Sequence, residues 1–377
     1  MRRTAAAILT IIVAVTAGGT VRSDDPVSSS LTFNREIVRV LERKCFQCHG
    51  PGSVAMPLAS YRDARAWSRA IREELVEGRM PPWGAAPGYT PLAHDGALTL
   101  REMAMLLTWL DGGMPRGDDR DLPAPPPTPA PDDAPDLLLQ LPPQDVPAEA
   151  DHVVRRVTVA ADPSTRRIAR LELRPGERRV LRAALITIET LTGSTWTGAW
   201  TPWQASFSPP DGAAFDLPPD ARLQVELHYR GRDTAITDRS AIALYSAAAS
   251  AVPVRQVTIP TRESARGRGS SPRRTGSARL EAAARLWALV PSGTSVPAAS
   301  GSLEVVARRP DGSTQVLLWI PEYRQEWPSP YLLKTPMDLP KGTLVSVTAT
   351  GAPVHQVALS ILTAGAIAES SATARAR

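Results

Sequence analysis

The residues best suited to chemistry stand together in the run Cys45-Phe46-Gln47-Cys48-His49. This run fits the C-x-x-C-H pattern at which haem is attached covalently in c-type cytochromes. Two thiols about one helical turn apart can each form a thioether with a vinyl group of one haem, and the adjacent imidazole can bind the iron. We therefore expect one covalent haem c, with Cys45 and Cys48 as its thioether residues and His49 as the proximal iron ligand.

Other interpretations of the motif are weaker. A C-x-x-C redox pair belongs with a βαβ pattern, which the surrounding sequence lacks. A zinc site needs further soft ligands, and the chain has two cysteines in all. The spacing could also arise by chance.

A methionine is the expected sixth ligand of the iron, because a thioether stabilises ferrous iron and suits an electron carrier. Met80 follows a predicted helix, in a turn that two prolines stiffen, and is our choice. Met56, which precedes a proline, is the alternative, and Met114 is a third candidate. Trp83 and Trp67 are candidates to pack against the macrocycle.

Helical periodicity surrounds the motif. Apolar residues recur at helical spacing over 33–41 and 99–110, and a further helix is predicted over 62–77. Asn34 is a possible N-cap of the first helix, and Gly78 a stop for the second. These helices would hold the thiols and the two axial ligands around one haem.

The second part of the chain has a different pattern. Short segments there alternate or run apolar, and Pro/Gly/Asp turns separate them, which predicts a β-sandwich. The Arg/Gly/Ser-rich stretch 262–280 interrupts the pattern and predicts a mobile loop. The predicted strands are 153–159, 167–173, 180–189, 222–229, 241–245, 286–290, 303–309, 315–320 and 343–350.

These patterns divide the chain into parts. We expect a signal peptide over 1–19, a cytochrome c domain over 30–116, and a proline-rich linker over 117–135. A β-sandwich region over 136–363, as one or two subdomains, precedes a disordered tail at 364–377. The predicted fold class is therefore multidomain: a mostly α-helical cytochrome c domain followed by an all-β double sandwich of jelly-roll type.

Charge and the N-terminus bear on location. The net charge is +5, but no clustered cations lie on a recognisable reading element, so no nucleic-acid partner is expected. Arg2 and Arg3 precede an apolar run over 5–17 that is short for a membrane span, as in a secretory signal. We expect export, to the periplasm or beyond. An uncleaved N-terminal anchor is the alternative, and is the one case in which a membrane would be a partner.

The first part resembles a group of bacterial cytochrome c domains fused to copper type II, ascorbate-dependent monooxygenase-like sandwiches. The peptidylglycine hydroxylating enzymes are the best-known members of the copper family. The resemblance implies a copper-enzyme fold for the second part, where the similarity is weaker. The matching segments are 33–36, 45–49, 61–67, 79–83 and 106–114, then 135–137, 173–176, 223–229, 310–312 and 339–342.

The copper ligands of that family are not matched. Arg182 and Ala183 stand where the family has a His-His pair, and of its His-x-His element only His228 remains, with Arg230 in the second place. No histidine lies in 291–294, near the family's His-Met-His stretch. Since copper needs imidazole or thioether ligands, we expect no copper and a degenerate sandwich.

The sequence therefore favours an electron carrier over an enzyme. We expect an exported cytochrome that transfers electrons to or from an unidentified redox partner protein, with the sandwich as a docking or binding module. The alternatives are a haem-bearing ligand-binding protein and, less favoured, an active copper monooxygenase fed by its own haem.

Overall fold

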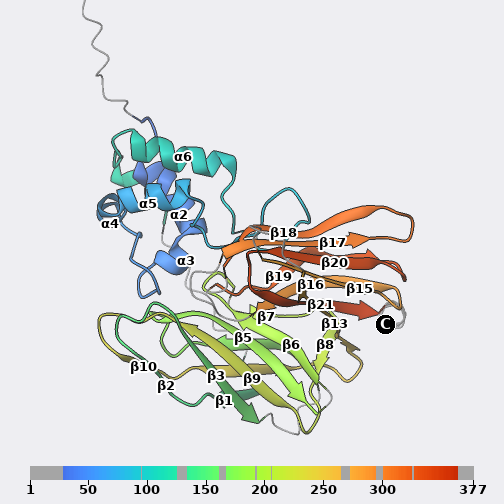
Figure 1. Ribbon diagram of the computed structural model, residues 1–377. Helices are drawn as coiled ribbons and strands as arrows, with labels where there is room; N and C mark the ends of the chain where they lie inside the picture. The colour runs from blue at the N-terminus through green and yellow to red at the C-terminus, as the bar shows by residue number, and fades with distance from the viewer. Residues whose placement is uncertain are drawn as a thin grey trace, which may run out of the picture.

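The computed structural model shows a mainly β chain with short helices at one side (Figure 1). The segments predicted as signal peptide and tail, and the centre of the predicted linker, lie outside the described residues. The structure describes residues 29–94, 96–124, 134–160, 167–191, 193–204, 206–264, 272–293, 300–324 and 327–363.

The predicted fold class is wrong. Strands make up 46% of the structure and helices 15%, and no helical cytochrome domain is evident. The physical reason lies in the sequence between the helices, where proline and glycine keep the described helices to 12 residues or fewer. The segment 83–97, which we expected to complete a helical domain, instead packs against the β-sheets. The architecture is β-sandwich-like.

The helices and strands follow each other along the chain, with helices first. The helical elements are η1 (Phe33–Ile37), α2 (Val38–Lys44), α3 (Phe46–His49), α4 (Tyr61–Ala66), α5 (Ser68–Val76), α6 (Leu100–Asp111) and η2 (Asp119–Asp121). The strands are β1 (Leu137–Gln140), β2 (Gln144–Val146), β3 (Val153–Ala160), β4 (Arg167–Arg174), β5 (Leu181–Thr190), β6 (Gly193–Trp200), β7 (Ser206–Phe207), β8 (Ala213–Asp216), β9 (Arg222–Tyr229), β10 (Ile236–Asp238), β11 (Ala241–Ser246), β12 (Val252–Pro253), β13 (Arg255–Pro260), β14 (Arg262–Glu263), β15 (Arg273–Arg279), β16 (Ala284–Gly293), β17 (Ser300–Arg308), β18 (Thr314–Arg324), β19 (Tyr331–Leu339), β20 (Leu344–Thr350) and β21 (Val354–Thr363).

The helices share a small core of their own. Phe33 of η1 packs against Trp109 of α6, with ring centroids 6.0 Å apart. A capping box begins α6, in which Thr99 accepts from the amide of Glu102 and the Glu102 carboxylate accepts in return. The predicted N-cap Asn34 is wrong, because its side-chain amide donates to the backbone at 117–118 instead.

The first sandwich holds the larger apolar core. One sheet has the order β1-β11-β4-β8-β12, with β7 beside β4, and the facing sheet has the order β3-β9-β5-β6. Leu171 and Ile242 from the first sheet and Val225 from the second are fully buried between them. The sequence predicted β3, β4, β5, β9 and β11 of these strands, because residues there alternate or run apolar.

The second sandwich packs against the first. Its sheets have the orders β13-β21-β16-β19 and β14-β15-β20-β17-β18. The ring centroids of Trp287 of β16 and Trp196 of the first sandwich are 6.4 Å apart, so one core continues into the other. The loop predicted over 262–280 is wrong at its ends, since 262–263 and 273–279 are strands β14 and β15. Residues 265–271 lie outside the described part.

The segment 83–97 ties the helical part to the second sandwich. The amide of Ala86 donates to the Trp319 carbonyl of β18, and that of Ala93 to the Leu332 carbonyl of β19, both at 2.8 Å. The hydroxyl of Tyr331 donates to the carbonyl of Trp83 at 3.1 Å. Backbone hydrogen bonds therefore fasten the chain that follows Met80 to the sheets. Within the described residues, no helix has the length and apolarity to cross a membrane.

Candidate functional site

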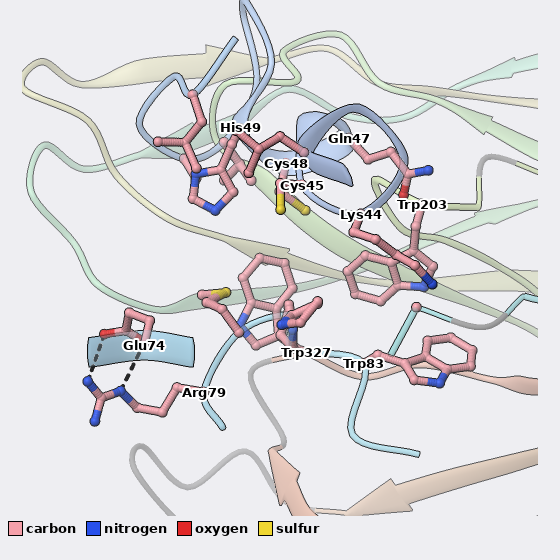
Figure 2. Close-up of a pocket in the computed structure, with 18 of the residues that line it drawn as sticks. Lys44, Cys45, Gln47, Cys48, His49, Glu74, Arg79, Trp83, Trp203 and Trp327 are labelled. Carbon is pink, nitrogen blue, oxygen red and sulfur yellow. Dashed lines mark hydrogen bonds and ion pairs between the residues drawn. The ribbon is translucent and has the colours of Figure 1, made fainter. Parts of the chain in front are cut away.

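A cavity of about 690 Å³ lies where the helices meet the sandwiches (Figure 2). Its volume falls within the range of roughly 300–1,000 Å³ typical of small-molecule and cofactor sites. Five of the six residues that the sequence offered to hold haem line it: Cys45, Cys48, His49, Met80 and Met56. The structure therefore brings together residues that are up to 35 positions apart in the sequence.

The two thiols enter the cavity from the short helix α3. The amides of Cys48 and His49 both donate to the carbonyl of Cys45, at 3.0 and 2.8 Å. This single turn directs both sulfur atoms into the cavity (Figure 2). Burial raises the pKa of each thiol to about 12. Dithiol redox motifs need a lowered thiol pKa, so this environment argues against that interpretation of the motif.

His49 is oriented for a role as a ligand. Its side chain is 8% exposed, and burial lowers the pKa of the imidazole, which favours the neutral form. Nδ1 lies 2.8 Å from the carbonyl oxygen of Met56, which can only accept, so Nδ1 carries the proton. A lone pair is then left on Nε2. In histidines that bind metals, a hydrogen bond from the other ring nitrogen fixes the tautomer in this way.

Met80 reaches the cavity through the way α5 ends. Gly78 adopts a left-handed conformation with φ of +67°, which turns the chain away from the helix axis. The amides of Arg79 and Met80 then both donate to the carbonyl of Glu74, at 2.9 and 3.2 Å. These contacts hold the position of Met80, while Met56 reaches the same cavity from the loop after α3.

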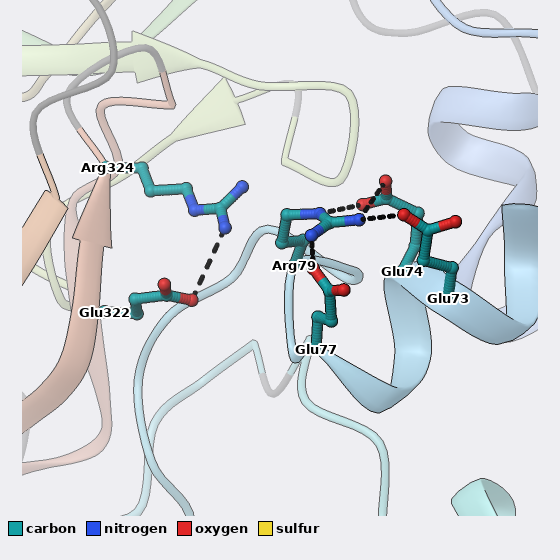
Figure 3. Close-up of polar contacts among 6 residues, drawn as sticks. All are labelled: Glu73, Glu74, Glu77, Arg79, Glu322 and Arg324. Atoms are coloured by element: carbon teal, nitrogen blue, oxygen red, sulfur yellow. Dashed lines mark hydrogen bonds and ion pairs between the residues drawn. The ribbon is translucent and has the colours of Figure 1, made fainter.

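An ion-pair cluster lies beside the same turn (Figure 3). Arg79 contacts several carboxylates, with a pair of hydrogen bonds to Glu74 at 2.9 Å each. These bonds hold the pKa of Arg79 above its usual value. Its other partners are Glu73 and Glu77. Because a bidentate pair has a defined geometry, the cluster restrains the residue that precedes Met80.

Three indoles form the aromatic part of the cavity wall. Trp83, Trp203 and Trp327 line it, and Trp203 packs against the other two with centroids 6.4 and 5.9 Å apart. Trp83 was predicted from the sequence as a partner of the macrocycle. The parallel prediction for Trp67 is wrong, since it is 44% exposed and lies away from the cavity. Met114 also lies elsewhere and packs into the helical core.

Sequence reasoning missed several residues of the wall. His94 lines the cavity, and burial lowers the pKa of its imidazole, so it is a further candidate ligand. Arg182, Arg230 and Arg324 line the cavity from the sandwiches. None of these four has a local sequence signal, because their approach to the motif depends on how the sheets pack against the helices.

The positions compared with copper ligands lie on neighbouring strands. Arg182 is on β5 and His228 on the adjacent β9. His152 directly precedes β3, and its Nε2 lies 3.1 Å from Nδ1 of His228, while Nε2 of His228 lies 2.9 Å from Glu226. Among the described side chains, no group of three or more His, Cys, Asp or Glu is arranged to hold a metal ion.

Comparisons with known proteins give little. No family model matches the chain, and the comparison with curated proteins found no match. Among solved structures, an allantoicase is 10% identical, with 54% of this chain and 76% of that chain covered, at a TM-score of 0.20. The major capsid protein P2 of bacteriophage PM2 is 9% identical, with 60% and 96% covered, at a TM-score of 0.22. The exported protein XepA of PBSX is 8% identical, with 57% and 86% covered, at a TM-score of 0.19. Similarity at these TM-scores does not establish a shared fold or function.

Proposed function

We propose that the chain carries one covalent haem c in the cavity and serves as an exported electron-transfer protein. The observation that carries the proposal is the convergence of Cys45, Cys48, His49 and Met80 on one cavity of suitable size. The motif alone predicts attachment, and the cavity supplies the volume that attachment needs.

The donor set and the walls suit a haem. Two thiols on one helical turn match the two vinyl groups, and a neutral imidazole beside them matches the iron. A macrocycle is flat, large and mostly apolar, and the indoles of Trp83, Trp203 and Trp327 provide extended faces for it. The bound haem would supply one-electron chemistry, with the iron changing between ferric and ferrous states.

The residues of the chain would control that chemistry by holding and shielding the group. The hydrogen bond from His49 to the Met56 carbonyl holds the imidazole in one tautomer. The backbone hydrogen bonds of Arg79 and Met80 to α5 hold the backbone from which the thioether extends. Buried apolar residues on the wall, such as Leu41, Leu58 and Leu106, keep water away. A restrained site changes little between oxidation states, which favours fast electron transfer.

The partner side of the proposal rests on sequence alone. The N-terminal pattern supports export, and a redox partner protein of unknown identity would receive or supply the electron. The resemblance to cytochrome domains fused to copper monooxygenase-like sandwiches supports the sandwich as a docking or binding module without copper.

The test is haem analysis of the exported chain, expressed with a c-type maturation system. We expect the wild type to keep its pigment through acid–acetone extraction, with one iron and no copper per chain. The C45S/C48S double variant should lose the covalent pigment, and each single variant should retain one thioether with a shifted ferrous absorption band. A control variant, Ser53→Ala, changes a hydroxyl near the motif without removing a sulfur and should keep all its haem.

Three outcomes would overturn the proposal in whole or in part. If acid–acetone strips the pigment from the wild-type chain, the haem has no thioether bonds. If the C45S/C48S variant still carries covalent haem, the haem is attached elsewhere. If covalent haem is present but the ferrous iron binds carbon monoxide readily, the sixth position is open, and the haem-bearing ligand-binding protein replaces the electron carrier.

A further inference from the structure

The charge of the cavity wall is nearly all of one sign. Among the described residues that line it, Glu74 is the one carboxylate. A concave site with this imbalance attracts and retains negative charge. Six cationic side chains line the cavity: Arg43, Lys44, Arg79, Arg182, Arg230 and Arg324.

Part of this positive charge is balanced by acids of the chain itself. Arg43 pairs with Glu102 at 3.1 Å, and Arg324 pairs with Glu322 at 3.4 Å (Figure 3). Arg79 pairs with the carboxylates of α5. The first sandwich adds Arg182 and Arg230 to the cavity wall, from a different part of the chain than the helices that carry the thiols.

The local fold of the sheet brings these two arginines to the same place. Arg182 is the extra residue at a bulge in β5, since the residues on either side of it pair with two consecutive residues of β9. A bulge redirects a side chain that regular pairing would place elsewhere. Arg230 directly follows β9, and its amide donates to the carbonyl of Val180 at 2.8 Å. The guanidinium of Arg182 also lies over the ring of Trp327, at 5.3 Å from its centre.

Trp203 contributes a donor to the same wall. Its indole Nε1 is buried and has no hydrogen-bond partner among the described residues. Buried N–H groups in native proteins are nearly always paired, and because Trp203 lines the cavity, an acceptor bound there would pair with this one. A carboxylate satisfies both the indole and the guanidinium groups, because it accepts hydrogen bonds and carries negative charge.

We infer that Arg182, Arg230 and Trp203 form the binding site for the propionate carboxylates of the haem. The inference rests on the proposed function. The vinyl groups and the propionates occupy opposite edges of a haem, so thiols on the helical wall direct the carboxylates away from α3. The sandwich would then hold the free edge of a group that the helices bind covalently, and its arginines would raise the reduction potential by opposing the charge of ferric iron.

Redox titration of the haem-loaded chain tests this. We expect R182Q and R230Q to keep their covalent haem but to shift the redox equilibrium constant threefold to tenfold toward the ferric form. Tenfold corresponds to 59 mV for a one-electron couple. R230K keeps the charge and should stay close to wild type. The matched control is R222Q, because Arg222 is exposed on the same strand β9 and lies outside the cavity.

A second arm separates the haem carboxylates from a free anion. Acetate is titrated into the wild type at constant ionic strength, and we expect no change in potential because the site is already filled. A saturable shift in the wild type that R182Q abolishes would show that a free anion occupies the site, and would overturn the inference. If R182Q and R230Q contain covalent haem but have the same reduction potential as R222Q, the inference about the carboxylate site is wrong, and the proposed function is unaffected. Wild-type chain without covalent haem would overturn the proposed function as well.

Discussion

Replacing Tyr331 by phenylalanine should loosen the segment that follows Met80. The Tyr331 hydroxyl is buried and donates to the carbonyl of Trp83 at 3.1 Å, and its ring packs edge-on against that indole at 5.2 Å. Phenylalanine keeps the ring contact but leaves the Trp83 carbonyl without this donor. Such a loss costs about 1–2 kcal/mol. The cost falls on the contact between segment 83–97 and the second sandwich.

Amide hydrogen exchange measures this opening locally. The amides of Ala86 and Ala93, which donate to β18 and β19, should exchange about 5- to 30-fold faster in Y331F. The control is Y89F, the same chemical change in the same segment, at a side chain that is 49% exposed. If the amides of Ala86 and Ala93 exchange at the same rate in Y331F as in Y89F, the hydrogen bond to Trp83 does not hold the segment.

Three further changes test other parts of the structure. Met80→Ala should abolish the sulfur-to-iron absorption band near the red edge of the ferric spectrum; a band that survives would make Met56 the ligand. Burial opposes ionisation of Glu226, but hydrogen bonds and charges from its histidine and arginine partners outweigh it and hold its pKa low. Its carboxylate therefore stabilises the fold above the unfolded pKa of about 4.3 and stops doing so as the pH falls through the folded value. Urea unfolding of E226Q should show a loss of about 1–2 kcal/mol at pH 7 that shrinks at acid pH; a constant loss would contradict the assignment. Gly276→Ala would place a Cβ 2.2 Å from the Pro260 carbonyl oxygen, so thermal unfolding should show a loss of about 1–3 kcal/mol, and an unchanged midpoint would count against this packing.

Local patterns in the sequence predicted a large part of the secondary structure. All nine predicted strands are present, with ends that differ by a few residues, because alternating burial is written directly into the residue order. Twelve described strands were missed. Strands β7, β12 and β14 have two residues each and carry no periodicity, but longer strands such as β6, β19 and β21 were missed as well. The helix predicted over 62–77 is divided at Trp67, where α4 ends and α5 begins.

Besides the short helices, a non-local contact explains why the predicted fold class failed. The segment from Trp83 to Ala97 has no strand or helix pattern of its own, and its partners lie more than 220 residues later, on β18 and β19. No sequence window includes both sides of that contact. The region 30–116, which the motifs predicted to be a helical domain, is therefore a small group of short helices beside a mainly β structure.

The sequence by itself determined the attachment motif, nine of the described strands and the first candidate ligands, because each depends on residues that are neighbours in the chain. Only the tertiary structure decided which of them meet. Met80 and Met56 share a cavity with Cys45 and Cys48, whereas Met114 packs into the helical core. A bulge between two strands brings Arg182 to that cavity, and such an approach depends on sheet pairing that residue order does not reveal.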